Sequence, residues 1–192
     1  SISMTLDECR TRTRVTVLPD ADGDEFVLGG ERPGDKSVQR LELFLRHVRE
    51  ISGRKEHLRI ESENAFPTGC GIASSASGFA ALALAASKAY GLELSPKELS
   101  RLARRGSGSA ARSIFGGFVE LRNGESDEDA FAEQLADAAH WPELRDVVAV
   151  VAEGEKTVSS AEGHGLAVKS EMMAGRLEAI PERVLRVRDA IR

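Results

Sequence analysis

The sequence predicts an α+β fold, in which strands and helices follow one another without the strict alternation of βαβ units. Three observations lead to this prediction. Threonines and valines occupy every second position from Thr11 to Val17, as in a strand with one buried face. Apolar residues recur at helical spacing between Val38 and Ile51. A glycine- and serine-rich segment then opens an alanine-rich helix within Pro67–Tyr90.

Length and composition restrict the class of protein. A chain of 192 residues fits one domain, or one domain and part of a second, and its 41% hydrophobic content suffices for a packed core. No run approaches ~18 consecutive apolar residues, so no membrane span is predicted. A net charge of −5 and an aromatic content of 5% argue against a nucleic-acid partner. Cys9 and Cys70 form no disulfide framework and no signal peptide is recognised, which predicts a cytoplasmic location.

The first part of the chain predicts three strands and a helix. Ser1–Leu6 is the first expected strand, and the alternating segment that ends at Leu18 is the second. Glu25–Leu28 follows a turn rich in aspartate and glycine and is expected to pair with the second strand as a hairpin. The helical spacing starts at Ser37, a predicted N-cap, and Gly53 stands just past the predicted helix end.

The rest of the chain continues the mixture. His57–Glu63 alternates as a strand, and the alanine-rich helix closes at Gly91. Ser95 caps the next helix, which runs to about Arg105, with proline at its first position and glutamate at its third. The remaining expected elements are a strand over Phe115–Leu121, an acidic helix over Ser126–Ala138, a buried valine-rich strand over Arg145–Ala152, and a helical segment from about Gly163 to Arg192 interrupted at Pro181.

The segment Asn64–Gly78 has the composition of an anion-binding loop. Its glycines let the backbone approach an anion closely, and the first N–H groups of the following helix point at the loop, where the helix dipole favours negative charge. Ser74, Ser75 and Ser77 add hydroxyl donors. The Walker A ending and the Rossmann glycine spacing are both absent. The segment predicts a cradle for a polyphosphate or, alternatively, a helix start whose small residues only pack tightly.

A second group of serines and glycines, Gly106–Ser113, follows the capped helix. Its backbone and hydroxyl groups can form a nest around an anion. Arg112 adds the paired donors that bind phosphate or carboxylate. The alternative is a polar connection with a solvated arginine. Two such segments, about thirty residues apart, predict one site for a nucleotide and another for a phosphorylated acid.

Both segments resemble one family. Pro67 and the string Gly71-Ile72-Ala73-Ser74-Ser75-Ala76 resemble the ATP-phosphate motif of the GHMP kinase superfamily. The longer string up to Ala81, and above all Ala103–Ser113 with Gly116-Gly117-Phe118, is similar to the diphosphomevalonate decarboxylases. The resemblance covers nearly the whole chain.

The resemblance implies a GHMP kinase fold, with a ribosomal-S5-like, ATP-binding N-terminal domain over residues 1–146 and the beginning of a second α+β domain over 147–192. It implies a homodimeric enzyme that uses ATP and Mg²⁺ to decarboxylate 5-diphosphomevalonate, a phosphorylated mevalonate, to isopentenyl diphosphate. The family's first strand and its catalytic aspartate segment have no counterpart between Ser1 and Arg192. Both ends are therefore expected to be incomplete.

The family's site residues are carried over position by position. The residues implied to surround the ATP phosphates are Gly69, Gly71, Ala73, Ser74 and Ser75. The residues implied to hold the substrate are Ser107, Ser109, Ser160 and Arg112, with the serines at the phosphate end. Arg112 faces the carboxylate and is the one residue assigned to catalysis, and no side chain is assigned to a metal. The glycines Gly116 and Gly117 are expected to let the following strand pass close to the site.

Three other functions remain open at this stage. A decarboxylase of mevalonate 5-phosphate or 3,5-bisphosphate would use the same residues. A GHMP small-molecule kinase would stop after phosphorylating the hydroxyl, and the availability of Arg112 for a carboxylate speaks against it. A catalytically incomplete fragment that kept the fold would lack the same two segments that this chain lacks.

Overall fold

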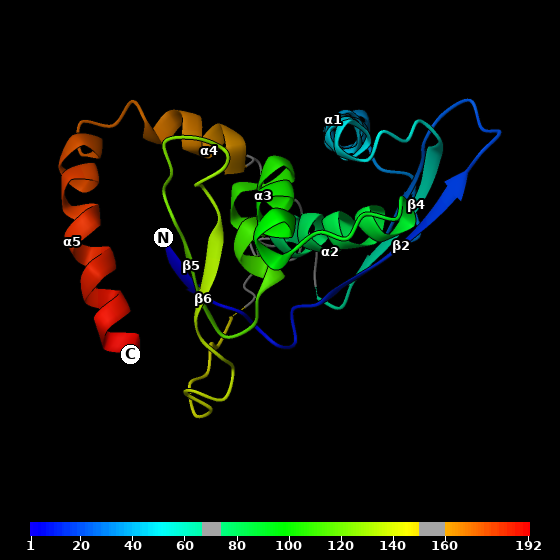
Figure 1. Ribbon diagram of the computed structural model, residues 1–192. Coiled ribbons are helices and arrows are strands. Elements are labelled where there is room, and N and C mark those ends of the chain that lie inside the picture. Colours follow the sequence, from blue (N-terminus) through cyan, green and yellow to red (C-terminus); the bar gives the residue numbers. More distant parts are fainter. Residues whose placement is uncertain (67–73, 150–159) are drawn as a thin grey trace.

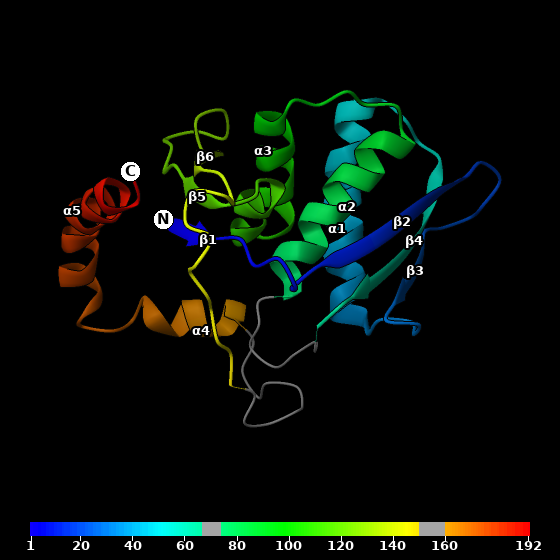
Figure 2. The same ribbon diagram turned by 90° about the horizontal axis from the view of Figure 1, so that it is seen from below.

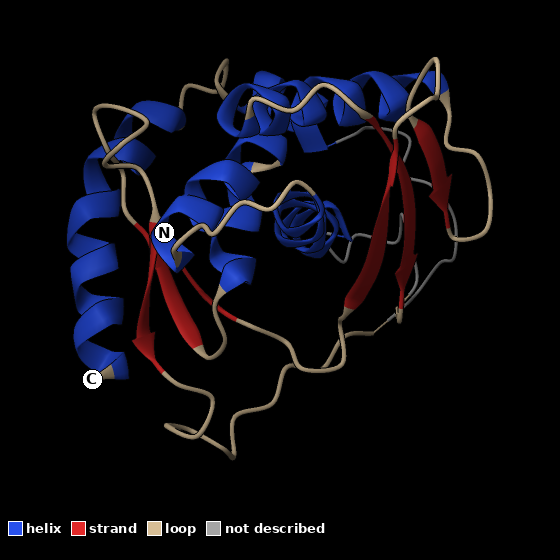
Figure 3. Cartoon of the chain, turned by 45° about the vertical axis from the view of Figure 1, so that its right-hand side comes forward, coloured by secondary structure: helices blue, strands red, loops and turns tan. Residues whose placement is uncertain are grey.

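The computed structural model describes residues 1–66, 74–149 and 160–192, which form two three-stranded sheets with helices between and beside them. Figure 1 shows the larger sheet on the right and the smaller sheet on the left, and Figure 3 shows the same two layers in red. The strands of the larger sheet are β2 (Thr11–Leu18), β4 (His57–Asn64) and β3 (Glu25–Leu28), and those of the smaller sheet are β1 (Ile2–Met4), β5 (Phe118–Leu121) and β6 (Ala132–Ala136). This mixture confirms the α+β prediction.

The larger sheet has the order β2-β4-β3, so the predicted hairpin between β2 and β3 is wrong. β4 lies between them, antiparallel to β2 and parallel to β3. One reason for this strand order is a contact of the turn before β3. There an Asp24 carboxylate oxygen accepts a hydrogen bond from the Leu58 N–H of β4 at 2.8 Å and pairs with Arg49 at 2.5 Å. The other is burial, because Leu58 and Ile60 of β4 are 0% and 1% exposed and need apolar neighbours on the helix side.

Helix α1 (Asp35–Ser52) packs against this sheet through an apolar face of Leu41, Phe44, Leu45 and Val48. Its predicted end is confirmed, since Gly53 adopts the left-handed conformation (φ 68°) that closes a helix. The predicted N-cap is wrong. The helix starts before Ser37, with Gly34 at the cap position and no side-chain capping bond.

Helices α2 (Ser74–Ala89) and α3 (Pro96–Gly106) complete the layer between the sheets, as the two views in Figures 1 and 2 show. α2 is the central helix and buries Phe79, Leu82, Ala83 and Ala86 in the main core. α3 begins with the predicted capping box, in which the Ser95 hydroxyl accepts from the Glu98 N–H while the Glu98 carboxylate accepts from the Ser95 N–H. A short 3₁₀ helix, η1 (Gly108–Ile114), follows α3 directly.

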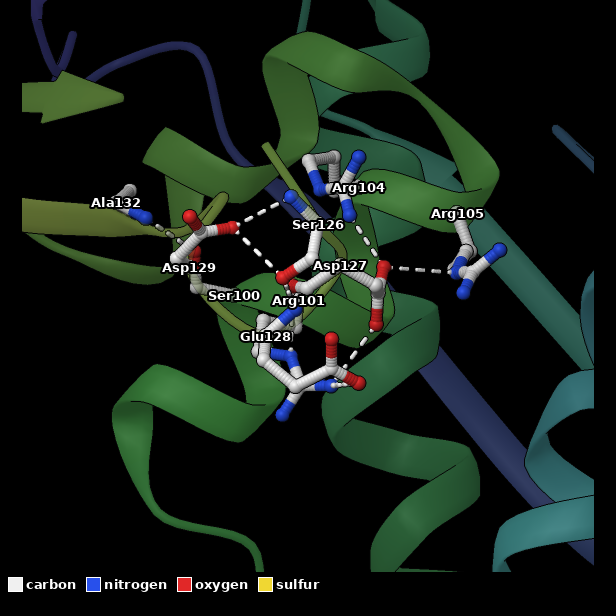
Figure 4. A network of polar contacts seen from close by, with 9 residues as sticks. All are labelled: Ser100, Arg101, Arg104, Arg105, Ser126, Asp127, Glu128, Asp129 and Ala132. Atoms are coloured by element: carbon white, nitrogen blue, oxygen red, sulfur yellow. Dashed lines mark hydrogen bonds and ion pairs between the residues drawn. The ribbon is translucent and has the colours of Figure 1, made fainter. Parts of the chain in front are cut away.

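The predicted acidic helix over Ser126–Ala138 is wrong, because this segment forms a turn followed by β6. The Asp129 carboxylate accepts hydrogen bonds from the backbone N–H groups of Glu125 and Ser126, a local alternative to helix that short polar side chains favour. Asp127 instead forms ion pairs with three arginines of α3 (Figure 4), which are Arg101, Arg104 and Arg105. β6 begins at Ala132, which is 1% exposed.

The C-terminal part differs from the sequence prediction at two places. Residues 145–149 of the predicted buried strand are irregular and exposed, with Val147 88% exposed, and no described strand pairs with them; residues 150–152 lie outside the described residues. The helical break falls at residues 168–172, between α4 (Ser160–Ala167) and α5 (Met173–Ile191), and Pro181 lies inside α5. A proline removes one backbone donor, which a long helix can tolerate. No helix in the described part of the chain is long and apolar enough to span a bilayer.

Helix α5 is held to β5 by a bidentate ion pair between Arg188 and Glu120. The Nε and Nη2 atoms of Arg188 donate to the two Glu120 carboxylate oxygens at 2.8 and 2.7 Å, and Glu120 is 7% exposed. The hydrogen bonds from Arg188 hold the pKa of Glu120 below its ordinary value. The pair therefore stabilises the protein above the ordinary carboxyl pKa, and this contribution is lost as the pH falls through the lowered pKa.

We expect Glu120→Gln to speed hydrogen exchange of the α5 amides at neutral pH, because a neutral amide binds the guanidinium more weakly. The same variant should flatten the rise in α5 exchange, after correction for the intrinsic rate, that acidification causes in the unmodified protein. Glu133→Gln, at the more exposed pair with Arg122, is the control. An unchanged α5 exchange pattern in Glu120→Gln would contradict this role.

Candidate functional site

Two cavities lie on either side of the first turn of α2. The larger, about 800 Å³, lies towards β1 and η1, and we name it the turn-side cavity. The smaller, about 570 Å³, lies towards α1 and the larger sheet, and we name it the sheet-side cavity. Ala76 and Ser77 line the turn-side cavity, whereas Ser74 and Ser75 line the sheet-side cavity. One helical turn therefore contributes to both.

Arg112 of η1 lines the turn-side cavity and carries its clearest charge. Its Nε donates to Ser3 Oγ and its Nη1 to Ser1 Oγ, each at 2.8 Å. Among the described residues no carboxylate forms an ion pair with it, and burial lowers the pKa of its guanidinium from the ordinary value. Two serine hydroxyls thus orient the guanidinium while its charge stays unneutralised. Such a group suits a carboxylate or phosphate ligand.

Two of the three serines predicted to bind substrate, Ser107 and Ser109, stand at the start of η1, the 3₁₀ helix that also carries Arg112. The hydroxyl oxygens of Ser107 and Ser109 are 3.3 Å apart, and Ser109 lines the turn-side cavity. η1 is fixed from α3 by the fully buried Ser100, whose hydroxyl donates to the Ala111 carbonyl at 3.1 Å and accepts from the Ala132 N–H at 2.8 Å. The turn that presents the two serines is therefore rigidly supported.

The sheet-side cavity has a mixed lining of polar and apolar side chains. Ser74 and Ser75 stand at the start of α2, where the N–H groups of a first helical turn lack intrahelical partners and the helix dipole favours an anion. The apolar lining residues come from β3, α1, β4 and α2, namely Leu28, Leu41, Ile60, Phe79 and Leu82, and the other polar ones are Thr13, Ser37, Arg40, Ser62, Glu63 and Asn64. A cavity with this lining can take a ligand that carries both an apolar ring and phosphates.

Arg40 of α1 also lines the sheet-side cavity, and the sequence prediction missed it. Its Nε and Nη2 donate to the Gly106 carbonyl at 3.1 and 2.7 Å, and its guanidinium lies 4.7 Å from the centre of the Phe79 ring. Gly106 is needed there, since a Cβ would lie 2.0 Å from Phe79 Cδ1. Arg40 thereby links the wall of the sheet-side cavity to Gly106, the residue before Ser107. Nothing in the local sequence distinguishes this arginine from the others on surface helices.

The structure brings some of the predicted site residues together and leaves others undescribed. Ser74, Ser75, Ser107, Ser109 and Arg112 gather around the two cavities. Gly69, Gly71 and Ala73 lie outside the described residues. Ser160 begins α4, and its side chain is likewise not described.

The two glycines before β5 have different roles. Gly117 adopts a left-handed conformation (φ 71°), and a Cβ there would lie 2.3 Å from the Ala136 carbonyl oxygen. The close approach observed at Gly117 is thus to the end of β6, whereas the sequence predicted a close approach of the strand to the site. A Cβ on Gly116 would meet nothing within 4 Å. Phe115, just before them, lines the turn-side cavity, and its carbonyl accepts from the Thr5 hydroxyl at 2.9 Å.

Comparison with known proteins gives consistent matches. A family model described as the diphosphomevalonate decarboxylase-like N-terminal domain matches residues 1–132. The diphosphomevalonate decarboxylase of Saccharomyces cerevisiae is 42% identical over 209 residues, covering 100% of this chain and 52% of that protein. The phosphomevalonate decarboxylase of Haloferax volcanii is 38% identical over 192 residues, covering 100% of this chain and 58% of that protein.

A solved structure, described as MDDEF in complex with MVAPP, AMPPCP and magnesium, is similar to this chain with a TM-score of 0.87. The identity is 42%, over 99% of this chain and 58% of that chain. The chain therefore spans between 52% and 58% of the length of the relatives named here.

We expect Gly117→Ala to lower the free energy of unfolding by about 2–4 kcal/mol, because it combines left-handed strain with a clash against the β6 backbone. Gly116→Ala should change it by less than about 0.5 kcal/mol. Urea unfolding of the two variants, one residue apart, measures this difference. Equal losses would show that the approach of the two strands does not require a glycine at position 117.

Proposed function

The chain belongs to the diphosphomevalonate decarboxylase-like N-terminal domain family, and we propose that the protein catalyses the ATP-dependent decarboxylation of 5-diphosphomevalonate to isopentenyl diphosphate. The observation that carries this proposal is the pair of cavities around the start of α2. One of them contains a half-buried arginine that no described carboxylate neutralises.

The turn-side cavity suits the phosphorylated acid. Arg112, oriented by Ser1 and Ser3, holds the substrate carboxylate until it leaves as carbon dioxide. Ser107 and Ser109 donate hydroxyl hydrogen bonds to the phosphate end, and Ser160 joins them there. The reaction needs these groups mainly for positioning and for electrostatic stabilisation.

The sheet-side cavity suits the nucleotide. Its apolar walls receive the base, and Ser74 and Ser75 with the N-terminal amides of α2 hold phosphates. Gly69, Gly71 and Ala73 complete this cradle. Mg²⁺, a hard cation that prefers oxygen ligands, would offset the charge of the nucleotide phosphates in this cavity.

The proposed reaction has two chemical steps, phosphorylation of the 3-hydroxyl and then loss of phosphate with carbon dioxide. The 3-hydroxyl oxygen forms a bond to the γ-phosphorus of ATP as the bond to ADP breaks, and the hydroxyl proton passes to a base. The tertiary hydroxyl thereby becomes a good leaving group. The C3–O bond then breaks to release phosphate, and the electron pair of the bond to the carboxylate becomes the alkene as carbon dioxide departs. No carboxylate of this chain is assigned as the general base for the hydroxyl proton. The protein's homodimeric state, its cytoplasmic location, and the division into domains at residues 146 and 147 are parts of the same proposal.

A second candidate differs only in the substrate. The Haloferax volcanii relative is a phosphomevalonate decarboxylase at 38% identity, and the two serines with Arg112 would also hold a 5-monophosphate or a 3,5-bisphosphate. Supplying the protein, expressed from its complete coding sequence, with each phosphorylated mevalonate and measuring carbon dioxide release separates these substrates. ATP consumption without carbon dioxide release would instead indicate a kinase, and neither would indicate a catalytically incomplete protein.

We expect Arg112→Ala to lower kcat/KM for the phosphorylated mevalonate by at least ~100-fold, because a desolvated charge contact to the carboxylate is lost. Nucleotide affinity, measured by calorimetry, should change by less than about threefold. Arg112→Lys keeps the charge without the paired donors and should recover part of the activity. Arg14→Ala, on the exposed face of β2, is the control. Undiminished turnover in Arg112→Ala would rule out the proposed substrate site.

A further inference from the structure

Ser100 of α3 is fully buried, and both hydrogen-bonding directions of its hydroxyl are used. The hydroxyl donates to the Ala111 carbonyl of η1 at 3.1 Å, and its oxygen accepts from the Ala132 N–H of β6 at 2.8 Å. Without this hydroxyl, a backbone carbonyl and a backbone N–H in the interior would each lose a partner, which costs free energy. Ser100 therefore ties η1 to both α3 and β6.

The carbonyl that Ser100 binds belongs to the peptide group between Ala111 and Arg112. A peptide group is planar, so a hydrogen bond that fixes its oxygen also restricts the positions of the Arg112 nitrogen and Cα atom. η1 is a 3₁₀ helix, whose internal hydrogen bonds have poorer geometry than those of an α-helix. A bond from outside therefore contributes more to the orientation of η1 than it would to that of an α-helix. Ser100 thus acts on the backbone at the base of the Arg112 side chain.

The other end of the Arg112 side chain is held by the first residues of the chain. The guanidinium donates to the hydroxyls of Ser1 and Ser3, each at 2.8 Å, and lines the turn-side cavity. Arginine has several rotatable bonds, and the ordering of such a side chain during binding costs free energy. A side chain that is fixed at its base and at its tip needs little further ordering when an anion binds. The two supports of Arg112 come from different elements, α3 and the start of the chain.

We propose that Ser100 is a positioning residue that sets the direction in which Arg112 presents its guanidinium to the carboxylate of a ligand in the turn-side cavity. The ligand is a phosphorylated hydroxy acid, and in this respect the inference rests on the proposed function. Ser100 lines neither cavity, so it acts only through the peptide group between Ala111 and Arg112. A displacement of about 1 Å in a positioning group can cost about 100-fold in rate. The loss of one buried hydrogen bond can therefore be felt at the site.

The chain contains a matched control at Tyr90. This residue is also buried, and its hydroxyl donates to a backbone carbonyl, that of Glu56. Tyr90 stands one residue past the C-terminal end of α2, whereas the two cavities lie around the first turn of that helix, and Tyr90 lines neither of them. Tyr90→Phe therefore removes a buried hydroxyl bond elsewhere in the core without acting on η1.

The experiment compares a ligand that has the carboxylate with one that lacks it. Calorimetry on the protein expressed from its complete coding sequence measures the affinity for 5-diphosphomevalonate and for isopentenyl diphosphate. Ser100→Ala should weaken the binding of 5-diphosphomevalonate at least about fivefold and that of isopentenyl diphosphate less than about twofold, since only the first ligand has a carboxylate for Arg112. Tyr90→Phe should change neither affinity by more than about twofold, because it is distant from the site.

A double-mutant cycle tests whether Ser100 acts through Arg112. In the Arg112→Ala background, Ser100→Ala should weaken the binding of 5-diphosphomevalonate by less than about 1.5-fold, because the contact that Ser100 positions is already lost. Thermal unfolding checks that each variant is folded at the assay temperature. If Ser100→Ala is not folded there, Ser100→Cys, whose thiol is a weaker donor, takes its place with the same expected order of affinities.

The outcomes separate this inference from the proposed function. Equal weakening of both ligands in Ser100→Ala, an unchanged affinity for 5-diphosphomevalonate, the same loss in Tyr90→Phe, or a full loss in the Arg112→Ala background would each overturn the role of Ser100 while leaving the decarboxylase proposal intact. The expected selective loss, in a protein that releases no carbon dioxide, would support the inference and reject the decarboxylase. Failure of the unmodified protein to bind 5-diphosphomevalonate would overturn both.

Discussion

The start of α2 is the constraint on which the rest of the structure depends. The first backbone N–H groups of a helix have no partners inside the helix, and they bind an anion, a polar neighbour or water. Here the first turn stands between two cavities, with Ser74 and Ser75 on one side and Ala76 and Ser77 on the other. The alanine-rich body of the helix buries Ala83 and Ala86 completely, which lets the surrounding elements approach closely. Two sites can therefore share a single helix end.

The placement of charge follows a clear division. The three arginines of α3 form ion pairs with Asp127 (Figure 4), and Arg188 of α5 pairs with Glu120, so these ion pairs hold helices and turns in place. Arg40 and Arg112 are half-buried beside the cavities, and among the described residues they donate to a carbonyl and to hydroxyls instead of carboxylates. Burial lowers the pKa of both guanidinium groups, because it removes water from around their charge. An anionic ligand would stabilise these charged groups.

Local signals in the sequence predicted the elements whose ends are set by adjacent residues. The Ser95 capping box and the left-handed Gly53 were confirmed because both act through bonds within one helix turn. Two of the errors arose where a distant residue decided the outcome. β4 separates β2 from β3 because Asp24 binds its backbone, and Asp127 is drawn out of the predicted acidic helix by α3. The family's site residues could be placed on the sequence because their strings are specific, but Arg40 carries no such signal.

The sequence by itself determined the α+β class, the membership of the family, and the two serine- and glycine-rich segments, because each depends on residue type and spacing within a short stretch. Only the tertiary structure decided that these segments meet at one helix end, that Arg112 lies without a described carboxylate partner, and that Arg40 of α1 donates to the Gly106 carbonyl at the end of α3. These are contacts between residues far apart in the chain. Their geometry follows from how the sheets and helices pack, which no local pattern specifies.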